Sequence, residues 1–147
     1  MSKYKQGVFK PLNPQKYKGN ISKSPPIYRS SWELRCMLKF DKHPDILEWS
    51  SEGVIIPYRS PIDNRLHRYF IDFYIKYKDS SGNIKTKIIE VKPKAQTKAP
   101  VKGKKTEMRY LREVMTYGVN DAKWEAAKQF AARKGWEFEV WTEAEIL

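Results

Sequence analysis

The first regular hydrophobic pattern along the chain is that of a helix. It predicts a helix that begins at Ser30 or Ser31, either of which can cap it, and that ends before Pro44. Polar and basic side chains occupy the opposite face. The apolar side chains recur at spacings of three and four residues, as on one buried helical face: Trp32, Cys36, Met37 and Phe40.

The middle of the chain has the composition of strands. A short apolar run at 54–56 precedes a turn-rich stretch, and residues 65–79 are rich in aromatic and β-branched side chains. The sequence SSGN at 80–83 favours a tight turn. Residues 84–92 are therefore predicted to run back as the hairpin partner of the long strand.

The C-terminal third returns to a helical pattern. We expect a short amphipathic helix at about 108–117 and a second helix at 120–134, with Asn120 or Asp121 as its cap and Gly135 as its end. Residues 136–141 alternate apolar and acidic, as in a half-buried strand. The predicted fold class is α/β (α+β), with a mixed four-stranded sheet flanked by helices in the order αβββαβ.

The charge of the chain indicates its kind of partner. The 147 residues carry a formal net charge of +12, with a pI near 9.7, which favours a polyanion. Both nucleic acid and an anionic membrane fit that sign, but no apolar run approaches the roughly 20 residues of a membrane span. Cys36 is the one cysteine, which leaves no internal disulfide. We expect a protein of a reducing compartment that handles DNA or RNA and contacts no membrane.

Much of the positive charge lies in two segments. Residues 1–29 hold seven Lys and Arg, four prolines and no acid, which predicts a basic N-terminal arm that orders on a partner; a solvated tail is the alternative. The rest, 30–147, is expected to form a single domain. A basic loop at 93–106 can grip a phosphate backbone or be a plain linker, and its lysines are Lys94, Lys98, Lys102, Lys104 and Lys105.

Charged side chains interrupt the two most apolar strands. Asp72 lies within 65–79, and Glu90 and Lys92 share one face of 84–92 because strand side chains alternate. If the strands pair, Asp72 and Glu90 become neighbours whose repulsion Mg²⁺ would relieve. A water activated by the metal can act as nucleophile, with Lys92 orienting it or neutralising a phosphate. Alternatively, Glu90 and Lys92 face solvent and Asp72 accepts backbone hydrogen bonds at a turn.

Glu33 lies on the apolar face of the first predicted helix, beside Cys36, Met37 and Phe40. A carboxylate in that direction can be a third acid of the metal site. The alternative is a capping box, Ser30-x-x-Glu33, in which Glu33 only satisfies a backbone N–H.

The segments IYRSSWE, HRYFIDFYI and IIEVKPK, in this order and followed by the KWEAA helix, resemble the PD-(D/E)xK nuclease superfamily. Within it they are similar to the head completion nuclease family of T-even-type bacteriophages and, more distantly, to TnsA-type transposon endonucleases. The resemblance covers about 28–141 and implies a restriction-endonuclease-like core. Ile71 replaces the proline of "PD", and Glu90 stands where TnsA-type enzymes often have glutamine.

The resemblance also implies roles for single residues. Asp72 and Glu90 would hold Mg²⁺, with Mn²⁺ also accepted, together with the Val91 carbonyl. Lys92 would be the catalytic lysine, and Glu33 the acidic residue of the first helix.

These observations together predict a Mg²⁺-dependent DNA endonuclease with little sequence specificity. The family role would be processing of packaged phage DNA during head completion and head–tail joining, in the host cytoplasm and the virion, with double-stranded DNA and phage portal or neck proteins as partners. The alternatives are a non-catalytic DNA-binding virion protein and a structure-selective junction nuclease. Candidate DNA contacts besides the loop lysines are His67, otherwise a surface histidine, and Lys123, next to the core candidate Trp124.

Overall fold

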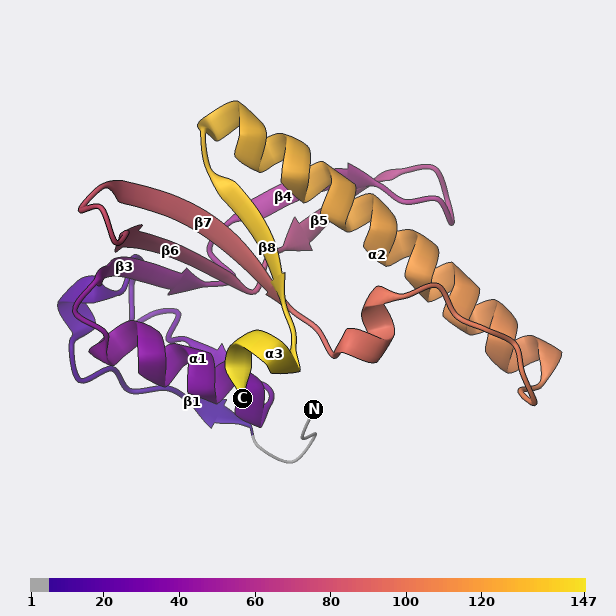
Figure 1. Ribbon diagram of the computed structural model, residues 1–147, viewed down its shortest axis with the longest axis horizontal. Helices are drawn as coiled ribbons and strands as arrows, with labels where there is room; N and C mark the ends of the chain where they lie inside the picture. Colours follow the sequence, from indigo (N-terminus) through magenta and orange to yellow (C-terminus); the bar gives the residue numbers. More distant parts are fainter. Residues whose placement is uncertain (1–5) are drawn as a thin grey trace.

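The computed structural model describes residues 6–147 as a mixed sheet with helices on both faces (Figure 1). The strand order is β3-β6-β7-β8, in which β3, β6 and β7 are antiparallel neighbours and β8 runs parallel to β7. The predicted fold class and the order αβββαβ are confirmed for the elements of this core. The four strands are β3 (Ile46–Ser51), β6 (Phe73–Lys78), β7 (Ile84–Val91) and β8 (Glu137–Trp141).

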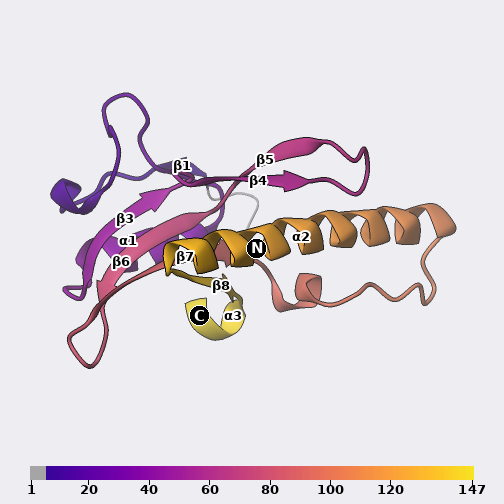
Figure 2. The same cartoon turned by 90° about the horizontal axis from the view of Figure 1, so that it is seen from above.

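Two helices cover opposite faces of the sheet. α1 (Ser31–Lys42) begins at the predicted cap, Ser30, whose side chain accepts the Glu33 N–H. α2 (Glu107–Lys134) connects β7 to β8 and continues well beyond the sheet, as Figure 2 shows from above. The short helices η2 (Lys94–Thr97) and α3 (Glu143–Ile146) follow β7 and β8 respectively.

Each face of the sheet has its own hydrophobic core. On the α1 side the buried residues include Met37, Phe40, Trp49 and Phe73, all without solvent exposure. On the α2 side the core is smaller, and it includes Tyr58, Tyr69, Tyr74, Ile88 and Ala127. Successive residues of β7 alternate between the two, so that Ile88 and Glu90 lie on the α2 side.

The strand predictions need two corrections. The first sheet strand is β3, and not the apolar run at 54–56, which begins β4 (Ile55–Arg59) of a separate hairpin. The predicted long strand divides into β5 (Leu66–Phe70), which pairs with β4, and β6. The chain leaves the hairpin at Ile71, which packs in the α2-side core, whereas Phe73 and Ile75 pack on the α1 side. Asp72 lies at this crossing point.

The prediction of two C-terminal helices is also wrong, because residues 107–134 form one helix capped by Thr106. Asn120 is a buried interior residue and caps nothing. Gly118 is half-buried, and its Cβ position would lie 3.9 Å from Pro61 of the β4–β5 hairpin, so packing continues across the expected break. The helix ends at Gly135, as predicted, with the left-handed φ of 71° that glycine permits.

The described part of the N-terminal segment packs onto the domain. Phe9 is buried in the α1-side core, and the N–H groups of Leu12 and Asn13 donate to the Asp41 carboxylate at 2.9 and 3.0 Å. Residues 1–5 of the expected arm lie outside the described residues. The regular elements within residues 6–29 are β1 (Gly7–Val8), η1 (Pro14–Lys16) and β2 (Ile27–Tyr28).

Candidate active site

The register of the β6–β7 pair places Asp72 opposite Glu90. Phe73 pairs with Ile89 at the start of β6. When this antiparallel register is extended by one residue, Asp72 lies opposite Glu90. Asp72 Oδ2 accepts the Val91 N–H at 2.7 Å, which fixes this carboxylate against the end of β7. Glu90 is only 7% exposed. Asp72 therefore accepts a backbone hydrogen bond, as the alternative interpretation of the sequence predicted. Glu90, however, is buried and does not face solvent, contrary to that interpretation.

The carboxyl of Asp72 is strongly perturbed by its surroundings. Burial raises the pKa of Asp72 well above its usual range, and the charge of Glu90 and a hydrogen bond with its carboxyl raise that pKa further. A buried pair of facing carboxyls is costly to ionise unless a positive charge lies beside it. A divalent cation is such a charge, and Mg²⁺ commonly takes one or two protein carboxylates and completes its shell with waters. The donor chemistry of Asp72 and Glu90 fits a hard divalent cation.

Glu33 lies near this pair but is held by the helix cap. Its carboxylate accepts the Arg29 N–H at 3.3 Å and the Ser30 hydroxyl at 3.3 Å. Burial raises the pKa of Glu33, these hydrogen bonds oppose the rise, and its charge contributes to the raised pKa of Asp72. In residues 6–147 no three His, Cys, Asp or Glu side chains gather closely enough to hold a metal ion. The structure thus brings two predicted acids together and leaves Glu33 in the cap.

Lys92 follows the last residue of β7 and continues its pairing, since its N–H donates to the Trp141 carbonyl at 2.9 Å. By strand alternation its side chain leaves on the same side as that of Glu90. The residue is half-buried, and within the described chain its ammonium has no carboxylate within 4.0 Å. A lysine of this kind is available to a bound anion.

Three residues that sequence reasoning missed or placed elsewhere surround the acids. The hydroxyl of Tyr69 lies beside Glu90 and the indole of Trp124. Glu52, at a left-handed φ of 55°, donates its N–H to the Asp72 carbonyl at 3.1 Å, and its side chain pairs with Arg29. Tyr69 could have been found from the alternation of β5, whereas Glu52 follows a strand that was not predicted.

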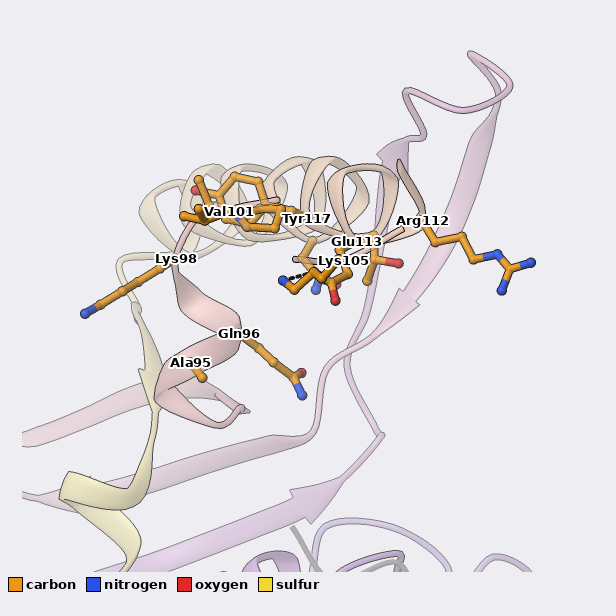
Figure 3. A pocket seen from close by; sticks show the side chains of 12 residues that line it. Ala95, Gln96, Lys98, Val101, Lys105, Arg112, Glu113 and Tyr117 are labelled. Carbon is orange, nitrogen blue, oxygen red and sulfur yellow. Dashed lines mark hydrogen bonds and ion pairs between the residues drawn. The ribbon is translucent and has the colours of Figure 1, made fainter. Parts of the chain in front are cut away.

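The candidate DNA contacts differ in their surroundings. Lys102 and Lys105 pair with Glu107 and Glu113 of α2, and Lys105 lines a cavity of about 810 Å³ between the basic loop and that helix (Figure 3). Figure 3 shows Lys98 and Arg112 extending away from this cavity. Among the described residues, no ion pair engages the other three loop lysines, namely Lys94, Lys98 and Lys104.

The two candidates outside the loop lie on the α2 side. His67 Nε2 is 2.8 Å from Asp63 Oδ2, and its ring packs against Tyr58. The Lys123 ammonium lies 5.5 Å from the Tyr69 ring centre, and therefore near the acids. Trp124 packs against the α2-side core, as expected, but its indole nitrogen is also close to the Tyr69 hydroxyl.

Comparison with known proteins places this geometry in a family. Residues 43–143 match the TnsA-like endonuclease N-terminal domain, a range that includes Asp72, Glu90 and Lys92. The chain is also 38% identical, over 141 residues, to the head completion nuclease of Enterobacteria phage T4, with 93% of this chain and 90% of that protein covered. The chain therefore belongs to the TnsA-like endonuclease N-terminal family and is related to the phage head completion nuclease.

Proposed function

We propose that this protein is a divalent-metal-dependent DNA endonuclease whose active site is built on Asp72, Glu90 and Lys92. The observation that carries the proposal is the pair of facing carboxyls, because burial and mutual repulsion make this pair costly unless a cation binds. Family membership makes DNA the expected substrate and a metal ion the expected cofactor. Mg²⁺ is the proposed ion, with Mn²⁺ as a substitute.

Each residue has a distinct task in this proposal. Asp72 and Glu90 would hold the cation, with the Val91 carbonyl as a further ligand, and the Val91 N–H keeps Asp72 oriented. A divalent cation held there supplies Lewis-acid activation of water and of the scissile phosphate. Lys92 orients the attacking water or offsets the charge that develops on the phosphate. Glu33, in its cap, shapes the electrostatic environment of Asp72.

The proposal is tested by incubating supercoiled and linear DNA with the protein in Mg²⁺, in Mn²⁺ and in EDTA. We expect nicking and cutting of unrelated sequences in both metals and none in EDTA. Cleavage that continues in EDTA would exclude the metal-dependent mechanism. Absence of cleavage in either metal, with DNA binding retained, would favour a non-catalytic DNA-binding protein.

We propose that the basic loop contacts the phosphate backbone through Lys98 and Lys104. Exposed lysines that bind phosphates make affinity nearly independent of sequence and steeply dependent on salt. The double variant K98Q/K104Q should therefore bind duplex DNA about tenfold or more weakly at moderate salt. The slope of log affinity against log salt should also fall by about 1 for each lysine–phosphate interaction that the substitutions remove. Both effects can be measured by fluorescence anisotropy with labelled duplexes.

The matched control is K42Q/K128Q, which removes the same charge from exposed positions on α1 and α2. If the control and the loop variant are weakened equally in DNA affinity, then overall charge and not the loop determines binding.

We further propose, by kinship with the phage T4 protein, that the natural substrate is packaged phage DNA during head completion and head–tail joining. Portal or neck proteins are then the proposed partners, in the host cytoplasm and the virion. Comparison of linear, nicked and four-way-junction DNA under the same conditions separates this role from that of a structure-selective junction nuclease. Within residues 6–147 no helix has the length and apolar character needed to cross a membrane.

A further inference from the structure

Two buried polar groups without hydrogen-bond partners lie beside the acid pair. In the described part of the chain, three buried side-chain atoms of this kind occur, and two of them are Tyr69 Oη and Trp124 Nε1. The third, Trp49 Nε1, belongs to the core on the other face of the sheet. A buried polar group left unpaired costs about 1–3 kcal/mol, so the two groups at one place need an explanation.

The position of Tyr69 relates both groups to Glu90. Its side chain is on the α2 side of the hairpin and is only 4% exposed. The Tyr69 hydroxyl lies near both the carboxyl of Glu90 and the indole of Trp124. A phenol is protonated at neutral pH, so the Tyr69 hydroxyl has a proton to donate.

Packing restricts the Tyr69 ring to this position. The Lys123 ammonium lies over the Tyr69 ring and the Tyr58 ring, at 5.5 and 5.7 Å from their centres. Tyr58 meets Tyr69 edge to face with ring centres 6.5 Å apart. A ring fixed by a cation and by a second aromatic ring keeps its hydroxyl within reach of one carboxylate.

We propose that Tyr69 is a positioning residue for Glu90, and that Trp124 supports it. The Tyr69 hydroxyl donates to the ionised Glu90 carboxylate when this binds a cation, and the Trp124 N–H donates to the Tyr69 oxygen. Asp72 has the corresponding support from the Val91 N–H, so each acid has its own donor. Donors of this kind orient metal ligands, and removing one typically weakens metal binding about 10–100-fold. The inference rests on the proposed function in that it takes Glu90 to be a metal ligand.

A purely structural role for Tyr69 predicts a different result for metal binding but not for stability. If its hydroxyl is only an unpaired group in the core, then phenylalanine removes the unfavourable burial and keeps the ring. Y69F would then be as stable as the wild type or more stable, and its metal binding would not change.

The test compares Y69F with the matched control Y58F, which removes a hydroxyl from the neighbouring ring on β4. Binding of Mn²⁺ to the DNA-free protein is measured by titration calorimetry, and unfolding in EDTA by urea. We expect Y69F to bind Mn²⁺ about tenfold more weakly at unchanged or higher stability in EDTA, and Y58F to keep wild-type affinity. W124F, which removes the indole N–H that supports Tyr69, should weaken Mn²⁺ binding less than Y69F does.

Equal Mn²⁺ affinity of Y69F and the wild type would overturn the role of Tyr69 and leave the proposed metal site intact. A wild-type protein that binds no Mn²⁺ would instead overturn the metal site itself, and the inference with it. The two failures are thereby distinguished without any measurement of cleavage.

Discussion

Replacing Asp72 by asparagine is expected to abolish DNA cleavage and to stabilise the metal-free protein. Asparagine keeps the size of the side chain and an acceptor for the Val91 N–H, but it removes a negative charge that a cation needs. It also removes a carboxylate whose pKa is raised by burial and by the charge of Glu90. Cleavage in Mg²⁺ should therefore fall to the level seen in EDTA. The urea midpoint in EDTA at neutral pH should rise.

The gain in stability should depend on pH in a defined direction. Because the pKa of Asp72 is higher in the folded state than in the unfolded state, its contribution is fully present below about pH 4 and is lost as pH rises through the folded pKa. The free energy of unfolding of the wild type in EDTA should thus fall with rising pH, relative to D72N. Each unit of pKa shift corresponds to about 1.4 kcal/mol. Saturating metal should raise the free energy of unfolding of the wild type and should not raise that of D72N.

Asp79, in the β6–β7 hairpin, provides a control because its pKa is lowered in the folded state, whereas that of Asp72 is raised. Its carboxylate accepts the N–H groups of Ser81 and Asn83, each at 2.9 Å, and these hydrogen bonds contribute to its lowered pKa. D79N should lower stability in EDTA at neutral pH and leave cleavage unchanged. If D72N retains cleavage near the wild-type rate, or if it is less stable than the wild type in EDTA at neutral pH, then the acid pair is not a strained metal site.

The prediction of the acid pair succeeded because two local signals agreed. The SSGN turn and the alternation of β7 were enough to place Glu90 on one face and Asp72 across from it. The division of residues 65–79 was missed because Ile71 is as apolar as Phe70 and Phe73. Only its packing, on the α2 side rather than with Phe73, reveals the crossing between two sheets.

Other features depend on contacts between distant segments. The positions of β3 do not alternate between buried and exposed, because the adjacent residues Trp49 and Ser50 are both buried. Trp49 lies in the α1-side core, and Ser50 lies near Gly53. Gly118 and Asn120 suggest a local break in α2, but the hairpin packs against that turn of the helix. Glu33 was open to two local interpretations, and in the structure its carboxylate accepts hydrogen bonds beside the Ser30 cap while lying close enough to Asp72 to perturb it. Such outcomes follow from tertiary packing, which no window of the sequence contains.

Replacing Lys92 by methionine should separate catalysis from binding. Methionine keeps much of the length of the side chain and removes the charge, and no carboxylate of the described residues lies within 4.0 Å of the ammonium to be left unpaired. Since Lys92 acts in the proposal on water and on the phosphate in the transition state, kcat should fall by about 10²–10⁴. Mn²⁺ affinity and duplex affinity should stay within a few-fold of the wild type.

The measurement is single-turnover cleavage of a labelled duplex at saturating protein, alongside calorimetry of Mn²⁺ binding. The matched control is K76M, a half-buried lysine on the neighbouring strand β6 whose replacement should leave the rate constant unchanged. Wild-type cleavage by K92M would remove Lys92 from the mechanism. Loss of Mn²⁺ binding in K92M would show that it acts on the metal ligands instead. A slow variant that binds both metal and DNA normally is the pattern expected of a group that acts only in the transition state, because binding of metal and ground-state DNA does not draw on its charge.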